Sequence, residues 1–386
     1  MISVDAALGH IFDLVTPLGS ETVPLRAAAG RVLAAPVVAQ HNQPPFRASV
    51  MDGYAVVGEA ESYTVIGEAA AGHPFEGTLG QGEAVRIFTG APLPETATRV
   101  IIQEDVTRAG DQITVAEGAD TKAYIRQIGA DFAAGDQIAS PRRLSSADVA
   151  LAAAMNVPEV TVARRPRVAV MATGDELIMP GETPKAGQII ASNTFGLAAM
   201  FEAEGAEVQF LPIARDTLAS LEATFDLARD ADLIVTIGGA SVGDHDLVGQ
   251  AAANRGLDRA FYKIAMRPGK PLMAGRMGQS AMVGLPGNPV SAMVCGHIFL
   301  RPMLRAMQGL PPARLPTKTA LLASDLPSNG PREHYMRAQF KNGQIQVADR
   351  QDSSLLTVLS SANALVVRPP NAKALVAGDE VPFMTF

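Results

Sequence analysis

A glycine-rich stretch in the second half of the chain decides the fold. It reads IVTIGGASVGDHD over residues 234–246, YKIAMRPGKP over 262–271 and AMVGLPGNPVS over 281–291. The first and last segments begin as apolar runs typical of buried strands and end in glycines that lead toward a helix. Such a turn presents free N–H groups at a helix N-terminus, which favours an anion. The stretch therefore indicates an α/β domain that binds a phosphorylated ligand.

Charged side chains follow the strands of this domain. Strands alternating with helices from residue 167 onward predict a parallel sheet with right-handed crossovers. Ligands of such sheets bind outside the carboxyl ends of the strands. We expect that edge to gather several charged residues: Asp175, Glu176, Asp216, Asp244, Asp246 and Lys270.

Composition excludes several classes of protein. The 386 residues carry a net charge of −7, which argues against nucleic acid as the main partner. No run of 18 apolar residues and no basic leader is present, so we expect neither a membrane span nor a secretory signal. The one cysteine, Cys295, excludes an intramolecular disulfide and a cysteine zinc site, and its apolar context predicts a buried, inert thiol. These features indicate a cytoplasmic protein.

Changes of pattern along the chain predict four domains. Residues 1–55 and 116–165 form a discontinuous helical and mixed N-terminal lobe, and the short β-like runs of 56–115 form an inserted, mostly antiparallel lobe. The α/β domain covers 166–309. Residues 310–386 return to short strands and predict a small β-barrel or sandwich. The fold class is thus multidomain, α/β plus β.

Six motifs, taken in order, resemble one known family. They are SVMDGYA (49–55), TGAPLP (89–94), TGDEL (173–177), GGASVGDHD (238–246), PGKP (268–271) and GLPGNPVS (284–291). Together they resemble the MoeA family of molybdopterin molybdenumtransferases, whose eukaryotic relatives include the C-terminal part of gephyrin. The resemblance covers essentially the whole chain.

The resemblance implies a reaction, a cofactor and partners. The family inserts molybdenum from molybdate into adenylylated molybdopterin and releases AMP, with Mg²⁺ as the usual cation. It also implies a homodimer, formed through the N-terminal lobe, with the active site in the cleft between subunits and a C-terminal β-barrel on each chain. The enzyme of the preceding adenylyl transfer is a further expected partner.

Two glycine loops are the expected phosphate site. In the first, Gly238, Gly239 and Ser241 would contact the ligand through N–H groups and a hydroxyl, although a plain strand–helix turn explains them too. In the second, Asn288 is placed to cap a helix and Pro289 to begin it. An ordinary capped helix is the alternative there. With Pro286 and Gly287, and with the family resemblance, this loop is predicted to seat the terminal phosphate of the pterin.

Carboxylates beside that phosphate are the expected metal ligands. Asp246 is the first choice for Mg²⁺, because a hard cation takes carboxylate and phosphoryl oxygens, and Asp244 is then a helix cap. Asp216, a second metal ligand, and Glu176 follow strands and would order metal, water or molybdate, although solvated loop acids are the simpler reading. Lys270 would pair with an oxyanion.

The remaining site residues come from the resemblance. Arg267 stands where the family often has lysine, so the positive charge is kept but the donor geometry differs. Asp52 and Thr89, otherwise a turn acid and a loop hydroxyl, are implied to be catalytic residues contributed across the dimer cleft. In the last domain the family pattern implies four further residues that reach the cleft, where arginine suits molybdate oxygens: Arg332, Arg337, Ser353 and Ser354.

Two other functions fit parts of the sequence. The preceding adenylyltransferase shares the α/β domain but needs no further lobes. A non-catalytic scaffold of the same family is the other alternative, and the departures at Arg267 and at Glu95 and Thr96 favour it, whereas the retained acids oppose it. Nothing in the sequence separates molybdate from tungstate as the oxyanion.

Overall fold

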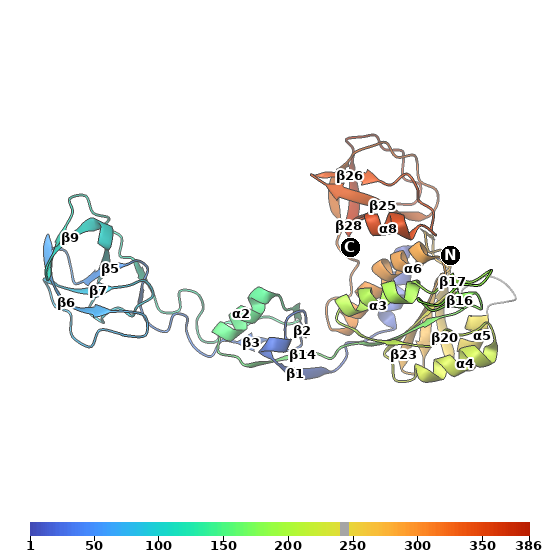
Figure 1. Cartoon of the computed structure of the whole chain (residues 1–386), viewed down its shortest axis with the longest axis horizontal. Helices are drawn as coiled ribbons and strands as arrows, with labels where there is room; N and C mark the ends of the chain where they lie inside the picture. The colour runs from blue at the N-terminus through green and yellow to red at the C-terminus, as the bar shows by residue number, and fades with distance from the viewer. Residues whose placement is uncertain (240–246) are drawn as a thin grey trace. The chain divides into compact units, whose positions relative to one another are not determined.

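The computed structural model describes residues 1–239 and 247–386 of the chain. It forms two compact units, Met1–Glu21 with Ala163–Phe386, and Thr22–Val162 (Figure 1). Each unit is described by itself. Among the described residues, no helix has the length and apolar character needed to cross a membrane.

A six-stranded sheet forms the centre of the first unit. Its order is β18 (Glu207–Phe210), β15 (Arg167–Ala172), β19 (Leu233–Ile237), β23 (Ser280–Leu285), β22 (Met273–Met277) and β20 (Leu257–Tyr262). The first four strands are parallel, as predicted, and their inner members are continuous buried runs. The last two strands extend the sheet in antiparallel fashion, which the sequence pattern did not indicate.

Helices cover both faces of this sheet. The described helices are α3 (Asn193–Ala203), α4 (Leu218–Leu227), α5 (Leu247–Asn254), α6 (Pro289–Cys295) and α7 (Arg301–Met307), with a π-helical turn, Gly296–Leu300, joining the last two. The helices α4 and α5 pack against one face, and the α3, α6 and α7 group packs against the other. The predicted α/β architecture is confirmed.

The N-terminal helix joins this domain from the other end of the chain. Helix α1 (Val4–Asp13) begins after Ser3, whose hydroxyl accepts from the amide of Ala6. Its buried face packs with the group that contains α7 and β20. The backbone carbonyl of Leu14 accepts from the Arg276 guanidinium at 2.6 Å. The first residues are therefore part of the α/β core.

The last part of the chain closes into a barrel. Strands β24 (Lys318–Leu322), β25 (Glu333–Lys341), β26 (Gln344–Val347), β27 (Ala364–Arg368) and β28 (Glu380–Thr385) form a ring, because β25 pairs with both β26 and β27. The predicted β-barrel is confirmed. Two smaller elements attach it to the α/β domain: β21 (Met266–Arg267), which pairs with β25, and α8 (Leu356–Ser361), which contacts α6.

The second unit contains two larger sheets and two two-stranded sheets, which pair β4 (Ala48–Ser49) with β11 (Ile125–Arg126) and β3 (Val37–Val38) with β12 (Gln137–Ile138). The larger has the order β8 (Arg99–Ile102), β5 (Gly53–Val56), β7 (Glu83–Ile87), β6 (Ser62–Ala69), β10 (Gln112–Val115) and β9 (Val106–Ala109), and only β6 and β7 run parallel. The smaller has the order β1 (Ser20–Pro24), β14 (Glu159–Ala163), β2 (Val32–Leu33) and β13 (Arg142–Arg143), beside helix α2 (Ser146–Ala154). Helix α2 is capped by Ser145 and Asp148, whose side chains each accept from the backbone amide of the other.

Candidate active site at the ends of the parallel strands

A cavity of about 860 Å³ lies at the carboxyl ends of β15, β19 and β23. Its walls come from loops that are distant in sequence, because parallel strands present their carboxyl ends at one edge. Sequence-predicted site residues in the wall are Glu176, Asp216, Gly238, Gly239, Pro286, Gly287, Asn288, Pro289 and Ser354. Ser241, Asp244 and Asp246 lie outside the described residues, so the structure adds nothing about them.

The two acidic loops of the cavity are tied together by an arginine. The Arg215 guanidinium donates to the carbonyls of Gly174, Asp175 and Leu177 at 3.4, 3.1 and 3.2 Å. The amide of Asp216 donates to the Asp175 carboxylate at 3.2 Å. Both side chains that carry the predicted chemistry, Glu176 and Asp216, remain exposed. Arg215 was not predicted as a site residue from the sequence.

Glycine is required in the loop after β19. Gly238 and Gly239 have φ angles of +96° and +66°, in the left-handed region. A Cβ atom would lie 2.7 Å from the carbonyl oxygen of Thr173 at the first position and 2.2 Å from a methyl carbon of Val248 at the second. The loop backbone thus packs directly against its neighbours.

The proline loop after β23 connects the cavity to the barrel domain. Asn288 occupies the N-cap position of α6 as predicted, but its side chain makes no capping bond. Instead its amide group donates to the Ser353 hydroxyl at 3.2 Å, and the Ser353 carbonyl accepts from Val290 at 3.0 Å. Ser354, next in sequence, lines the cavity. Ser353 thus bonds to the proline loop, whereas Ser354 forms part of the cavity wall.

Two polar groups in the cavity wall have no partner within the described protein. The hydroxyl oxygen of Thr173 is buried, and this residue is 4% exposed. The side-chain amide oxygen of Asn193 is also buried, although the residue as a whole is half-buried. The Asn193 amide nitrogen donates to the Gly287 carbonyl at 2.8 Å, which fixes its orientation. Buried polar atoms usually have a hydrogen-bond partner, so these two oxygens are unusual among the described residues of the cavity wall. Neither was identified from the sequence.

The predicted basic residues lie away from the cavity wall. Arg267 is exposed on β21, Lys270 is exposed in the loop that follows it, Arg332 is half-buried, and Arg337 is fully buried on β25. One amino group of Arg337 donates to the Asp352 carbonyl at 2.9 Å, while its other amino group and its Nε have no partner in the described structure. Burial lowers the pKa of Arg337.

Asp52 and Thr89 belong to the second unit and lie together there. The amide and the hydroxyl of Thr89 both donate to one oxygen of Asp52, each at 2.7 Å. These hydrogen bonds, the backbone one first, hold the pKa of Asp52 below its usual value. Arg86 stacks on Tyr54 and Phe88 beside them. Thr89 thus holds Asp52 as an ionised carboxylate in a fixed orientation.

Cys295 is buried in α6, as predicted, and its burial raises the pKa of its thiol.

No group of three acidic, histidine or cysteine side chains suited to a metal occurs in the part of the chain that the structure describes. Glu176 and Asp216 nevertheless offer exposed carboxylates on one cavity wall.

Three family models match nearly the whole chain: the MoeA N-terminal region (domains I and II) at residues 2–156, a probable molybdopterin-binding domain at 169–306, and the MoeA C-terminal region (domain IV) at 319–386. A molybdopterin molybdenumtransferase from Nostoc sp. is 35% identical, over 99% of this chain and 93% of its own. Molybdopterin molybdenumtransferase 2 from Mycobacterium tuberculosis is 38% identical, over 93% of each. A crystal structure of a molybdopterin biosynthesis MoeA protein from a Pyrococcus species has a TM-score of 0.82 at 30% identity, over 100% of this chain and 99% of the other. The chain belongs to the MoeA family.

Proposed function

We propose that this chain is a molybdopterin molybdenumtransferase of molybdenum cofactor biosynthesis. The substrates are adenylylated molybdopterin and molybdate, and the products are molybdenum-bearing molybdopterin and AMP. One observation carries the proposal: a single cavity collects the glycine loop after β19, the proline loop after β23 and the acids Glu176 and Asp216. Relatives named for this activity match the chain along nearly its whole length.

The cavity suits a ligand that has both a ring system and phosphate groups. Its loops after β19 and β23 expose backbone close to the ligand space, which suits phosphate. Thr173 and Asn193 supply unpartnered hydrogen-bonding oxygens on the same wall, which suit the polar edge of a pterin ring. The volume of about 860 Å³ lies in the range of sites for such ligands.

Residues of the cavity fit a magnesium ion. Mg²⁺ is usually held by one or two carboxylates with substrate phosphates and water, and Glu176 and Asp216 offer two exposed carboxylates. Asp246 is the third proposed ligand. When bound, the ion would offset negative charge on the phosphoanhydride. Arg215 keeps both acidic loops in place, and Lys270, Arg267, Arg332 and Arg337 are proposed to attract molybdate.

The active form is proposed to be a homodimer in which Asp52 and Thr89 complete the partner's site. Their support is the Asp52 carboxylate, which accepts two hydrogen bonds from Thr89 and whose pKa these bonds lower. Two inactive variants, Asp52→Asn and Glu176→Gln, test this arrangement. After mixing and subunit exchange, about a quarter of the wild-type activity should return, because half the dimers then hold one intact site. No recovery, with exchange verified, would contradict shared sites.

The reaction itself is tested by AMP release. Purified protein is mixed with adenylylated molybdopterin, MgCl₂ and molybdate, and AMP is measured by chromatography. We expect release that depends on both ions and falls at least a hundredfold in Glu176→Gln. Glu182→Gln is the matched control, since Glu182 is an exposed acid of the following loop that does not line the cavity. Absence of AMP with wild-type protein would favour a scaffold role instead.

A further inference from the structure

A row of basic side chains crosses three neighbouring strands at one end of the barrel domain. His334 on β25 pairs in register with Arg267 on β21 and with Arg368 on β27. Residues opposite each other on paired strands project from the same face of a sheet. The three side chains therefore stand in one row.

This row faces the inside of the barrel. Met336 and Ala338 follow His334 at every second position of β25, and Val366 and Ala364 precede Arg368 in the same way on β27. All four belong to the apolar interior of the barrel or pack against it. Because side chains alternate along a strand, His334 and Arg368 share the interior face and close its end. Arg337 is on the opposite face of β25 and so belongs to a different surface.

The two inner groups of the row are buried without partners. Arg368 is 2% exposed and His334 is 7% exposed. In the described structure, Nε and one amino group of Arg368, and Nε2 of His334, have no hydrogen-bond partner. The other amino group of Arg368 donates to the carbonyl of Lys373. No carboxylate of the described residues forms an ion pair with Arg368, and burial alone lowers its pKa.

A buried, unpaired guanidinium is costly unless a negative charge compensates it. Burial, followed by the positive charges of Arg267, Arg337, Arg332 and Arg368, lowers the pKa of His334 to about 4. The region thus has donors in excess and no acid to satisfy them. Asn329 fixes the backbone beside this row, because its side-chain amide group donates to the carbonyls of Arg332, Arg368 and Pro369 at 2.9, 3.1 and 2.7 Å.

We propose that this end of the barrel binds one small dianionic oxyanion, such as sulfate, phosphate, molybdate or tungstate, between Arg368, His334 and Arg267. Arg368 donates through its free Nε and amino group, Arg267 through its exposed end, and His334 through Nε2. The arriving negative charge favours the protonated imidazole, so binding takes up a proton at His334. None of the three residues lines the cavity at the strand ends, and Arg267 is the one residue of this site that the proposed function also uses.

The test measures binding of inorganic oxyanions to the full-length protein without any pterin. Sodium sulfate, phosphate, molybdate and tungstate are titrated by calorimetry at constant ionic strength, and the thermal midpoint is followed in parallel. We expect the anion to raise the midpoint of the wild-type protein by mass action and the affinity to fall at least tenfold in Arg368→Met. The order of the four affinities identifies the physiological oxyanion. Arg350→Met, at an exposed arginine of the same domain, should bind as the wild type does.

Proton uptake provides a second readout. Titrations at pH 6 in two buffers of different ionisation enthalpy should show uptake by the wild type and none by His334→Gln, which keeps a neutral donor. If Arg368→Met does not fold, Arg368→Lys keeps the charge with fewer donors and should still weaken binding.

Equal affinity of Arg368→Met and wild type, or no stabilisation of the wild type by any of the four anions, would overturn the proposal. So would a tungsten peak located elsewhere in a tungstate-soaked crystal. These binding measurements use no pterin, so a protein without transfer activity would still give the same result. The oxyanion site and the transferase function are therefore tested independently.

Discussion

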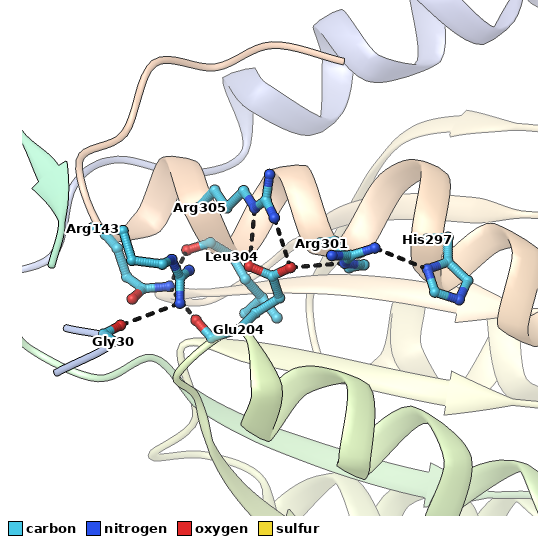
Figure 2. A network of polar contacts seen from close by, with 8 residues as sticks. Gly30, Arg143, Glu204, His297, Arg301, Leu304 and Arg305 are labelled. Atoms are coloured by element: carbon cyan, nitrogen blue, oxygen red, sulfur yellow. Dashed lines mark hydrogen bonds and ion pairs between the residues drawn. The ribbon is translucent and has the colours of Figure 1, made fainter. Parts of the chain in front are cut away.

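A buried carboxylate at the C-cap of α3 should control the stability of the helix group on one face of the sheet. Glu204, whose side chain is 5% exposed, accepts from Nε of Arg301 at 2.7 Å and from Arg305 at 2.9 and 3.0 Å (Figure 2). Burial alone would raise the pKa of Glu204, but the hydrogen bonds from Arg305 and Arg301 outweigh it and lower the pKa. We therefore choose Glu204→Gln as the perturbation.

The expected loss follows from the exposure of the three side chains. Removing one partner of a fully buried ion pair costs about 3–5 kcal/mol. Arg301 and Arg305 keep 18% and 31% of their side-chain exposure, so water compensates part of their charge. We expect a loss of about 2 kcal/mol, which is about a thirtyfold increase in the opening of α3 and α7. Native-state hydrogen exchange, read by mass spectrometry on peptides of these helices, measures that opening directly.

The control is Glu202→Gln, because Glu202 is exposed on the same helix. Its exchange should match the wild type. At pH values below the lowered pKa of Glu204 the wild-type carboxyl is neutral, so the difference between wild type and Glu204→Gln should disappear on acidification. A change smaller than about threefold at pH 7 would refute the claim that the charge of Glu204 stabilises the two helices.

Three further outcomes are expected. Burial, followed by the positive charge of Arg301, lowers the pKa of His297 to about 3. Between about pH 6.5 and 3 the unfolded chain therefore binds more protons than the folded protein. The free energy of unfolding, measured by urea titration, should fall as the pH drops through this range. His297→Gln should flatten that fall. The thiol of Cys295 should not react with Ellman's reagent at pH 8 until denaturant is added, and rapid reaction in native buffer would contradict its burial. Gly239→Ala should lose at least tenfold in affinity for molybdopterin in a fluorescence titration, because its Cβ would lie 2.2 Å from Val248, whereas Gly256→Ala, with open space around it, serves as the control for a positive φ.

Local signals in the sequence predicted those parts of the fold that depend on neighbouring residues. The strand that leads into Gly238, the helix that begins after Asn288 and the barrel within residues 310–386 all follow from short patterns. The antiparallel strands β22 and β20 were not predicted, because an apolar run does not specify its direction in a sheet.

Parts of the site required tertiary contacts that no local pattern encodes. Arg215 stood beside a predicted acid, but its role depends on carbonyls about forty positions earlier in the chain. Thr173 and Asn193 became visible only through the burial of their oxygens. His334 and Arg368 are isolated residues in the sequence, and only the register of three strands places them in one row.

The first helix has a consequence for synthesis on the ribosome. Helix α1 is translated before its packing partners, because its buried face packs with β20 and with α7, which ends at Met307. The amide of Leu18 donates to the carbonyl of Met307 at 2.7 Å, across most of the chain. Until that partner emerges, the apolar side of α1 has no native surface to cover it, and exposed apolar segments of nascent chains favour aggregation. Helix α1 must therefore wait for β20 and α7 before it can form its native contacts, and its apolar face is a target for chaperones that bind nascent chains.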